Sequence, residues 1–188
     1  MASDTKTALL DFAEQAARAR GFDGFSYADL AKSVGIRKAS IHYHFPTKAE
    51  LSEALMDRYH ETISAKCAEI TASSEKASDR LLGLVNLYRT ALNEGKTLCL
   101  CVSFTASHQS LSDAVNAKIS AFRSAIVKWL QSVFALGKDD ASISGVSEPQ
   151  LEAFATLAVL EGAHLAARAD EDVAVFDQAV AVLVARCK

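Results

Sequence analysis

Two capped helix starts constrain this chain more than any other feature of its sequence. Ser26 and Asp29 have the S-x-x-D spacing of a capping box, which predicts a helix that begins at residue 27. Thr47 and Glu50 form a second box, T-x-x-E, which predicts another helix that begins at residue 48. Because both boxes are local patterns, the two starts can be placed to within a residue or so.

A short helix is predicted between these two starts. Gly35 supplies a tight turn after the first helix, which runs over about residues 27–34. Pro46 disfavours helical backbone at Phe45, so the short helix covers about residues 38–44. Two short helices joined by a glycine turn have the spacing of a helix-turn-helix, which lays its second helix in the major groove of DNA.

The outward face of the short helix is polar. At 100° per residue, Ile41 and Phe45 point inward. The outward residues are Ala39, Ser40, His42 and Tyr43. A buried helix would not show this face. A metal site is not expected either, because rings two residues apart, as in His42 and His44, diverge by about 200° and zinc takes about four ligands.

The segment YADLAKSVGIRKASIHYHFPTKAEL, residues 27–51, resembles the motif of the TetR/AcrR (tetracycline-repressor-like) transcriptional regulators. It departs from that motif at Ala39, where glycine is frequent, and at His42, where tyrosine is usual. The resemblance implies a helix-turn-helix DNA-binding domain over residues 1–47 and a helical effector-binding and dimerisation domain over residues 48–188. It also implies a repressor that binds a palindromic double-stranded DNA operator as a homodimer and is released by a small-molecule effector.

The same resemblance implies which residues contact DNA. The base-proximal positions are Lys38, Ala39 and Ser40. The expected contacts to the DNA backbone are Ser26, Tyr27, Tyr43, His44 and Lys48. Arg37 and His42 complete the predicted interface. The charge pattern agrees, because residues 32–48 include Lys and Arg but no acid, although the whole chain has a net charge of −3.

The rest of the chain is also predicted to be helical. Apolar residues recur at helical spacing over about residues 7–20, 78–94, 97–108, 115–136, 148–169 and 172–186. Gly21, Gly95 and Gly137 are the expected helix ends. No segment shows the alternation of a strand, so the fold class is all-α with about nine helices.

The last two predicted helices are apolar around most of their circumference, which is typical of helices buried on two sides. We expect them to form a four-helix bundle with a second copy of the chain, the alternative being central helices of a monomer. The candidate dimer-interface residues are Leu157, Gly162, Phe176, Val180 and Leu183. Gly162 would permit a close helix crossing.

An effector pocket in the C-terminal helices is implied by the resemblance. Its candidate lining residues are Tyr88, Phe104, His108, Phe122, Trp129 and His164. For each of them, an ordinary core position is the alternative. The two histidines rank highest because they are polar groups on largely apolar helices.

Cys99 and Cys101 suggest an alternative function, a thiol-based sensor of oxidants or electrophiles with the same fold. Side chains two residues apart on a helix diverge, so a disulfide between them would need unwinding. Buried apolar cysteines are the competing interpretation.

Other function classes are less favoured. The sequence contains no G-x-S-x-G, H-E-x-x-H, P-loop or G-x-G-x-x-G, so we expect no enzyme and no cofactor. A non-DNA-binding interaction protein is a further alternative. The longest apolar stretch, residues 151–167, contains two glutamates and a histidine, and no signal peptide is recognisable. A cytoplasmic protein without a membrane segment is therefore expected.

Overall fold

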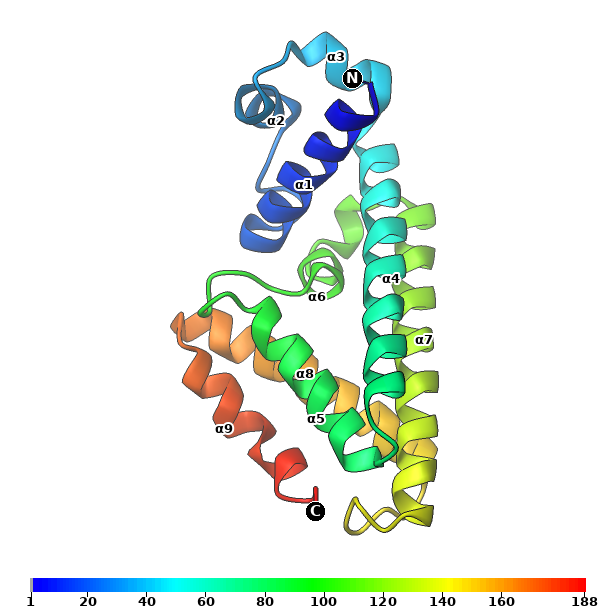
Figure 1. The fold of residues 1–188 in the computed structure, drawn as a ribbon. Helices are drawn as coiled ribbons and strands as arrows, with labels where there is room; N and C mark the ends of the chain where they lie inside the picture. Colours follow the sequence, from blue (N-terminus) through cyan, green and yellow to red (C-terminus); the bar gives the residue numbers. More distant parts are fainter. Residues whose placement is uncertain (1) are drawn as a thin grey trace. The chain divides into compact units, whose positions relative to one another are not determined.

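A computed structural model describes residues 2–188, and within that range the chain is all-α (Figure 1). The helices are α1 (Ala2–Arg20), α2 (Tyr27–Val34), α3 (Lys38–His44), α4 (Lys48–Ser73), α5 (Ala77–Ala91), α6 (Leu100–Thr105), α7 (Asp113–Asp139), α8 (Pro149–Asp170) and α9 (Val173–Val184). A single 3₁₀ turn, His108–Ser110, lies between α6 and α7. The predicted fold class is confirmed.

The chain divides into two compact units. The first unit comprises the residues up to Glu61 together with Leu100–Ala121, and the second comprises Thr62–Cys99 together with Phe122–Lys188. Helices α4 and α7 therefore contribute residues to both units. The domain boundary predicted from the sequence, between residues 47 and 48, separates two functions. The two compact units are divided elsewhere, because the first part of α4 belongs to the same unit as α1 to α3.

In the first unit, α1 buries an apolar stripe of residues spaced four apart. Leu9, Ala13 and Ala17 are fully buried, as the amphipathic pattern predicts. Helix α6 packs on α1, where the Ser103 hydroxyl donates a hydrogen bond to the carbonyl of Ala17 at 2.6 Å. This buried polar contact fixes α6 against the last turns of α1.

In the second unit, α5, α8 and α9 pack together (Figure 1). Phe176 on α9 is fully buried, and its ring lies edge-on to the imidazole of His164 on α8. Arg89 of α5 makes a two-pronged ion pair with Asp177 of α9. Burial of apolar side chains therefore determines how these helices pack. The exposed ion pair contributes little to stability in comparison.

Several predicted helix boundaries were wrong. Helix α1 begins at residue 2 rather than near residue 7, and α5 ends at residue 91 rather than near residue 94. The helix predicted over residues 97–108 shortens to α6, and the N–H of Cys99, just before α6, donates to the Nδ1 atom of His164. Helix α7 passes through Gly137 to Asp139. A Cβ atom at Gly137 would lie 2.8 Å from Ile143, so this glycine allows close packing rather than ending the helix.

Along residues 2–188, none of the helices combines the length and the apolar character that crossing a membrane requires.

Candidate nucleic-acid interface

Helix α3 is anchored by a small number of apolar side chains. Ile41 is fully buried, and Phe45, which follows the helix, is also buried. The backbone N–H of Phe45 donates to the carbonyl of Ile41 and closes the last turn. Since one face of the helix is fixed in this way, its other residues are directed away from the core.

The outward residues of α3 agree with the sequence pattern. Arg37, Lys38, Ala39 and Ser40 are exposed, and the side chain of Tyr43 is 82% exposed. A hollow of about 550 Å³ lies against this surface. Its lining residues are Thr5, Ile36, Arg37, Ala39, Ser40, Tyr43 and His44. Thr5 was not among the predicted interface residues, because no local pattern connects the start of α1 with α3.

Basic and hydroxyl groups dominate this surface. Arg37 and Lys38 supply two cations at the start of α3, and the first turn of the helix contains no acid. Ser40 and Tyr43 supply hydroxyl groups that can donate to and accept from base edges or phosphate oxygens. Such a surface, cationic and rich in hydroxyl groups, suits a nucleic acid better than an apolar ligand.

The two histidines of α3 have different surroundings. The Nδ1 atom of His42 lies 3.0 Å from the carbonyl oxygen of Pro46, and its ring packs against Tyr27. The ring of His44 instead lies edge-on to Tyr43, with 5.2 Å between the ring centroids. The residues that the structure describes contain no cluster of three or more histidine, cysteine or acidic side chains that could bind a metal.

The α2 capping box is confirmed. The Asp29 N–H donates to the Ser26 hydroxyl oxygen at 3.3 Å, and the Ser26 N–H donates to the Asp29 carboxylate at 2.8 Å. The Ser26 hydroxyl also donates to that carboxylate, which lowers the pKa of Asp29. A carboxylate therefore lies at the α2 N-terminus, the position at which the resemblance implied a contact with a DNA phosphate.

Tyr27 faces inward, whereas the resemblance implied a contact with DNA. Its side chain is buried, and its hydroxyl donates to the carbonyl of Phe45 at 2.8 Å. Burial, with a smaller contribution from the charge of Glu50, raises the pKa of Tyr27 to about 12. The hydroxyl thus links α2 to the end of α3, and in this structure it is directed away from the exposed surface.

Lys48, predicted to bind a phosphate, is also directed toward its own chain. Its ammonium donates to the carbonyls of Phe22 and Phe25 and lies over both of their rings. Burial lowers the pKa of Lys48, while the charges of Asp23 and Asp29 oppose that shift. The Thr47–Glu50 capping box beside it has both of the predicted hydrogen bonds.

The candidate effector residues are divided between the two units. Phe104 and His108 belong to the first unit, whereas Tyr88, Phe122, Trp129 and His164 belong to the second. His164 is fully buried, accepts from the Cys99 N–H at Nδ1, and has Nε2 2.8 Å from the Tyr88 carbonyl. Because Nδ1 is an acceptor, Nε2 carries the proton and donates. Both ring nitrogens are therefore used by the backbone, and His164 is a core residue in this structure.

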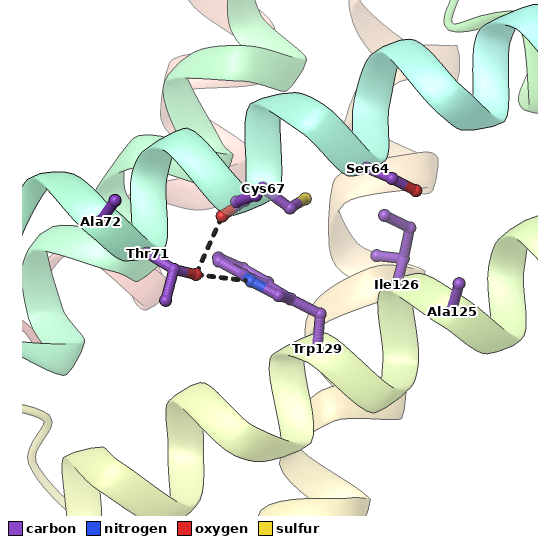
Figure 2. Close-up of a pocket in the computed structure, with 8 residues that line it drawn as sticks. Ser64, Cys67, Thr71, Ala72, Ala125, Ile126 and Trp129 are labelled. Carbon is purple, nitrogen blue, oxygen red and sulfur yellow. Dashed lines mark hydrogen bonds between the residues drawn. The ribbon is translucent and has the colours of Figure 1, made fainter.

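A pocket of about 410 Å³ lies between α4 and α7 in the second unit (Figure 2). The residues that line it are Ser64, Cys67, Ala68, Thr71, Ala72, Ala125, Ile126 and Trp129. The Trp129 indole N–H donates to the Thr71 hydroxyl oxygen at 3.0 Å, and that hydroxyl donates to the carbonyl of Cys67. Of the six predicted effector residues, Trp129 belongs to this lining.

Most of the candidate interface residues of α8 and α9 face their own chain. Leu157, Phe176, Val180 and Leu183 are buried. Gly162 differs, because a Cβ atom there would meet nothing within 4 Å. The apolar pattern correctly showed that both helices have two apolar sides but did not show which side the chain itself covers.

The exposed side of α8 is also apolar. Leu151, Phe154 and Leu165 are 67%, 55% and 50% exposed. With Ala158 and Gly162, which are also exposed, they recur at spacings of three and four residues and form one stripe. We call these five residues the α8 stripe.

Both cysteines of the thiol hypothesis are buried. Cys101 lies in α6 and Cys99 immediately precedes it. Cys67, which the hypothesis did not include, is also buried, and burial raises its pKa to about 11. A buried thiol with a raised pKa is less reactive than an exposed one.

Comparisons with known proteins agree with this geometry. Residues 9–55 match the family model described as "Bacterial regulatory proteins, tetR family". The HTH-type transcriptional repressor NemR of Escherichia coli K12 is 26% identical over 171 residues, which is 88% of this chain and 84% of NemR. A TetR-family regulator from Agrobacterium tumefaciens has a structure with TM-score 0.94 and 25% identity, with both chains fully covered. E. coli NemR in its reduced form has TM-score 0.83 and 22% identity over 98% of this chain and 97% of NemR.

Proposed function

Because this chain is a TetR-family DNA-binding transcriptional regulator, we propose that it represses transcription by binding a palindromic operator through α3. The observation that carries the proposal is the exposed polar face of α3, on which Arg37, Ser40 and Tyr43 line one hollow and Lys38 is exposed. A single seven-residue helix contacts few base pairs, so two copies related by a two-fold axis would contact two half-sites about one turn apart.

Selection from a random double-stranded DNA library tests this proposal. The protein should enrich a sequence with two inverted half-sites whose centres are about 10 base pairs apart. Enrichment of an unpaired motif would contradict the two-fold arrangement, and the absence of any enrichment at low salt would contradict sequence-specific binding. The relatives reported above are named as regulators, and the role proposed here is binding without catalysis.

We propose that a second copy of this chain covers the α8 stripe. Exposed large apolar side chains in one row usually indicate an interface. Replacement of Gly162 by leucine would add a side chain where the chain itself has open space, so folding should be unaffected while a close crossing between copies is blocked. Light scattering at low micromolar concentration should then give the monomer mass.

The matched control is Ser124→Leu, which adds the same side chain at an exposed position of α7 outside the α8 stripe. This variant should keep the dimer mass. A dimeric Gly162→Leu variant would show that the stripe is not the crossing point.

We propose that the small-molecule effector binds in the pocket between α4 and α7. Its lining has no charged side chain, and the two hydrogen bonds among Trp129, Thr71 and Cys67 already satisfy the central polar groups (Figure 2). A neutral, largely apolar molecule fits these properties. Trp129 is the single tryptophan of the chain, so its fluorescence reports directly on the pocket.

Nitrobenzene, a neutral and non-fluorescent aromatic quencher, is a suitable first probe. Saturable quenching that weakens when Ala68 or Ala125 is replaced by leucine, which would fill the pocket, supports this site. Quenching that is unchanged in both variants would place binding elsewhere.

The thiol sensor is the second candidate function. The similarity to NemR, a structure of which is in the reduced form, favours it, while the burial of Cys99 and Cys101 opposes it. The double variant Cys99→Ser and Cys101→Ser should still be released from DNA by an apolar effector. If oxidants release the parent protein but not this variant, the thiol function is the correct one.

A further inference from the structure

Lys48 joins two segments that are far apart in the sequence. It is the first residue of α4, and its partners Phe22 and Phe25 lie 26 and 23 positions earlier, in the connection between α1 and α2. All three residues belong to the first unit. The contact therefore connects the start of α4 to the segment that leads into α2.

Four contacts surround the Lys48 ammonium. Its Nζ atom lies 2.5 Å from the carbonyl oxygen of Phe22 and 2.7 Å from that of Phe25. The same atom is 4.3 Å and 4.4 Å from the centroids of the two phenylalanine rings. Two of its three N–H donors are thus used by carbonyls, and cation–π attraction adds to these hydrogen bonds.

The α1–α2 connection needs such a partner because it is tightly folded. Gly21 has a φ of 79°, and a Cβ atom at Gly24 would lie 2.2 Å from the carbonyl oxygen of Arg20. In this conformation, the carbonyl oxygens of Phe22 and Phe25 approach one point. Two carbonyl dipoles aimed at one point repel each other unless a cation or other donor lies between them.

We propose that Lys48 is a positioning residue, which fixes the α1–α2 connection and thereby the direction in which α2 presents α3 to DNA. This inference rests on the proposed DNA-binding function. A direct phosphate contact by Lys48 would require the ammonium either to leave these four contacts or to use only its third donor. The two roles predict different dependences on salt, which makes them separable.

The experiment compares Lys48→Met with Lys38→Met. Methionine keeps the apolar stem of lysine and removes the ammonium, and Lys38 is the matched control because it is exposed on α3. Binding to the selected operator and to a random duplex is measured by fluorescence anisotropy over a series of salt concentrations. Hydrogen exchange of the amides of residues 21–27 is measured on the same proteins without DNA.

For Lys48→Met, exchange in residues 21–27 should be about tenfold or more faster, as expected for loss of hydrogen bonds to a charged donor. The preference for operator over random duplex should fall, while the slope of log affinity against log salt should be unchanged. For Lys38→Met, the slope should fall by about 0.9 per subunit with unchanged exchange, since an exposed cation that the DNA neutralises releases about one counterion, including one that lies close to the bases.

Unchanged exchange in Lys48→Met, together with a slope reduced by about 0.9, would overturn the inference and assign Lys48 to a phosphate. Should Lys48→Met fail to fold, Lys48→Gln replaces it, because an amide keeps two N–H donors without the charge. Lys48→Gln should retain part of the protection from exchange. A smaller slope of log affinity against log salt, without faster exchange, would again overturn the inference. If the parent protein shows no salt-dependent DNA binding, the proposed function fails. The exchange measurement still tests whether the Lys48 contacts with Phe22 and Phe25 fix the α1–α2 connection.

Discussion

Helices α2 and α3 are neighbours of eight and seven residues that use their side chains in opposite ways. The first residues of α2 are used within the chain, through the Ser26–Asp29 capping box and the buried hydroxyl of Tyr27. Helix α3 has no side-chain cap, and its exposed residues include Ser40 and Tyr43. The difference indicates that α2 holds α3 in place, so that the α3 surface can contact DNA without contributing to the stability of the fold.

The largest expected effect is on stability, from Leu30→Ala in α2. Leu30 is 1% exposed, and truncation of a buried leucine lowers the free energy of unfolding by about 2–5 kcal/mol. Urea denaturation measures the change through a shift of the midpoint at constant slope. Tyr43→Ala on α3 is the control and should change stability by no more than about 0.5 kcal/mol. Similar losses in the two variants would remove the distinction between the helices.

A smaller effect is expected from Tyr27→Phe. The change removes the hydrogen bond to the Phe45 carbonyl and should lower the free energy of unfolding by about 0.5–1.5 kcal/mol. Affinity for random DNA, measured on the folded protein, should be unchanged. Weaker DNA binding with unchanged stability would instead mean that the hydroxyl contacts DNA.

The pH dependence of stability provides a control for Tyr27. Its folded-state pKa of about 12 lies above the ordinary value of 10.0, so its contribution is complete below pH 10 and is lost as the pH rises toward 12. Tyr27→Phe should lack this part of the alkaline transition. An identical alkaline profile in the parent and the variant would contradict the buried position of the phenol.

The smallest expected effect concerns the capping box of α2. Hydrogen bonds from Ser26 lower the pKa of Asp29, so its contribution is present above the ordinary value of 3.8 and is lost as the pH falls through the folded-state pKa. In Asp29→Asn this acid-dependent component should be missing. Thermal unfolding between about pH 2.5 and 6 would reveal it, and equal pH profiles for the two proteins would contradict the assignment.

Much of the fold could be predicted because its signals are local. The two capping boxes and Gly35 predicted helix starts at residues 27 and 48 and the turn between them, and the structure confirms all three. Helix α3 over residues 38–44 was likewise predicted, since Pro46 and its neighbours determine where it ends.

The remaining features depend on residues that are distant in sequence. The inward direction of Tyr27 depends on the Phe45 carbonyl, and the position of the Lys48 ammonium depends on the path of residues 21–26. The buried state of Leu157 and Phe176 depends on which face of α8 and α9 the chain covers. An apolar pattern shows that a face is covered and does not identify the element that covers it.

The central claim is that α3 determines sequence specificity. Its most direct test is the ratio of operator affinity to random-duplex affinity in the Ser40→Ala variant. Its operator affinity should fall by the roughly 1–3 kcal/mol of a specific base contact, or about 5- to 150-fold, with little change on random duplex and none in the urea midpoint. Ser33→Ala, at an exposed position of α2, is the matched control and should bind both duplexes as the parent does. Equal losses on operator and random duplex in Ser40→Ala, or a loss of preference in Ser33→Ala, would contradict the account.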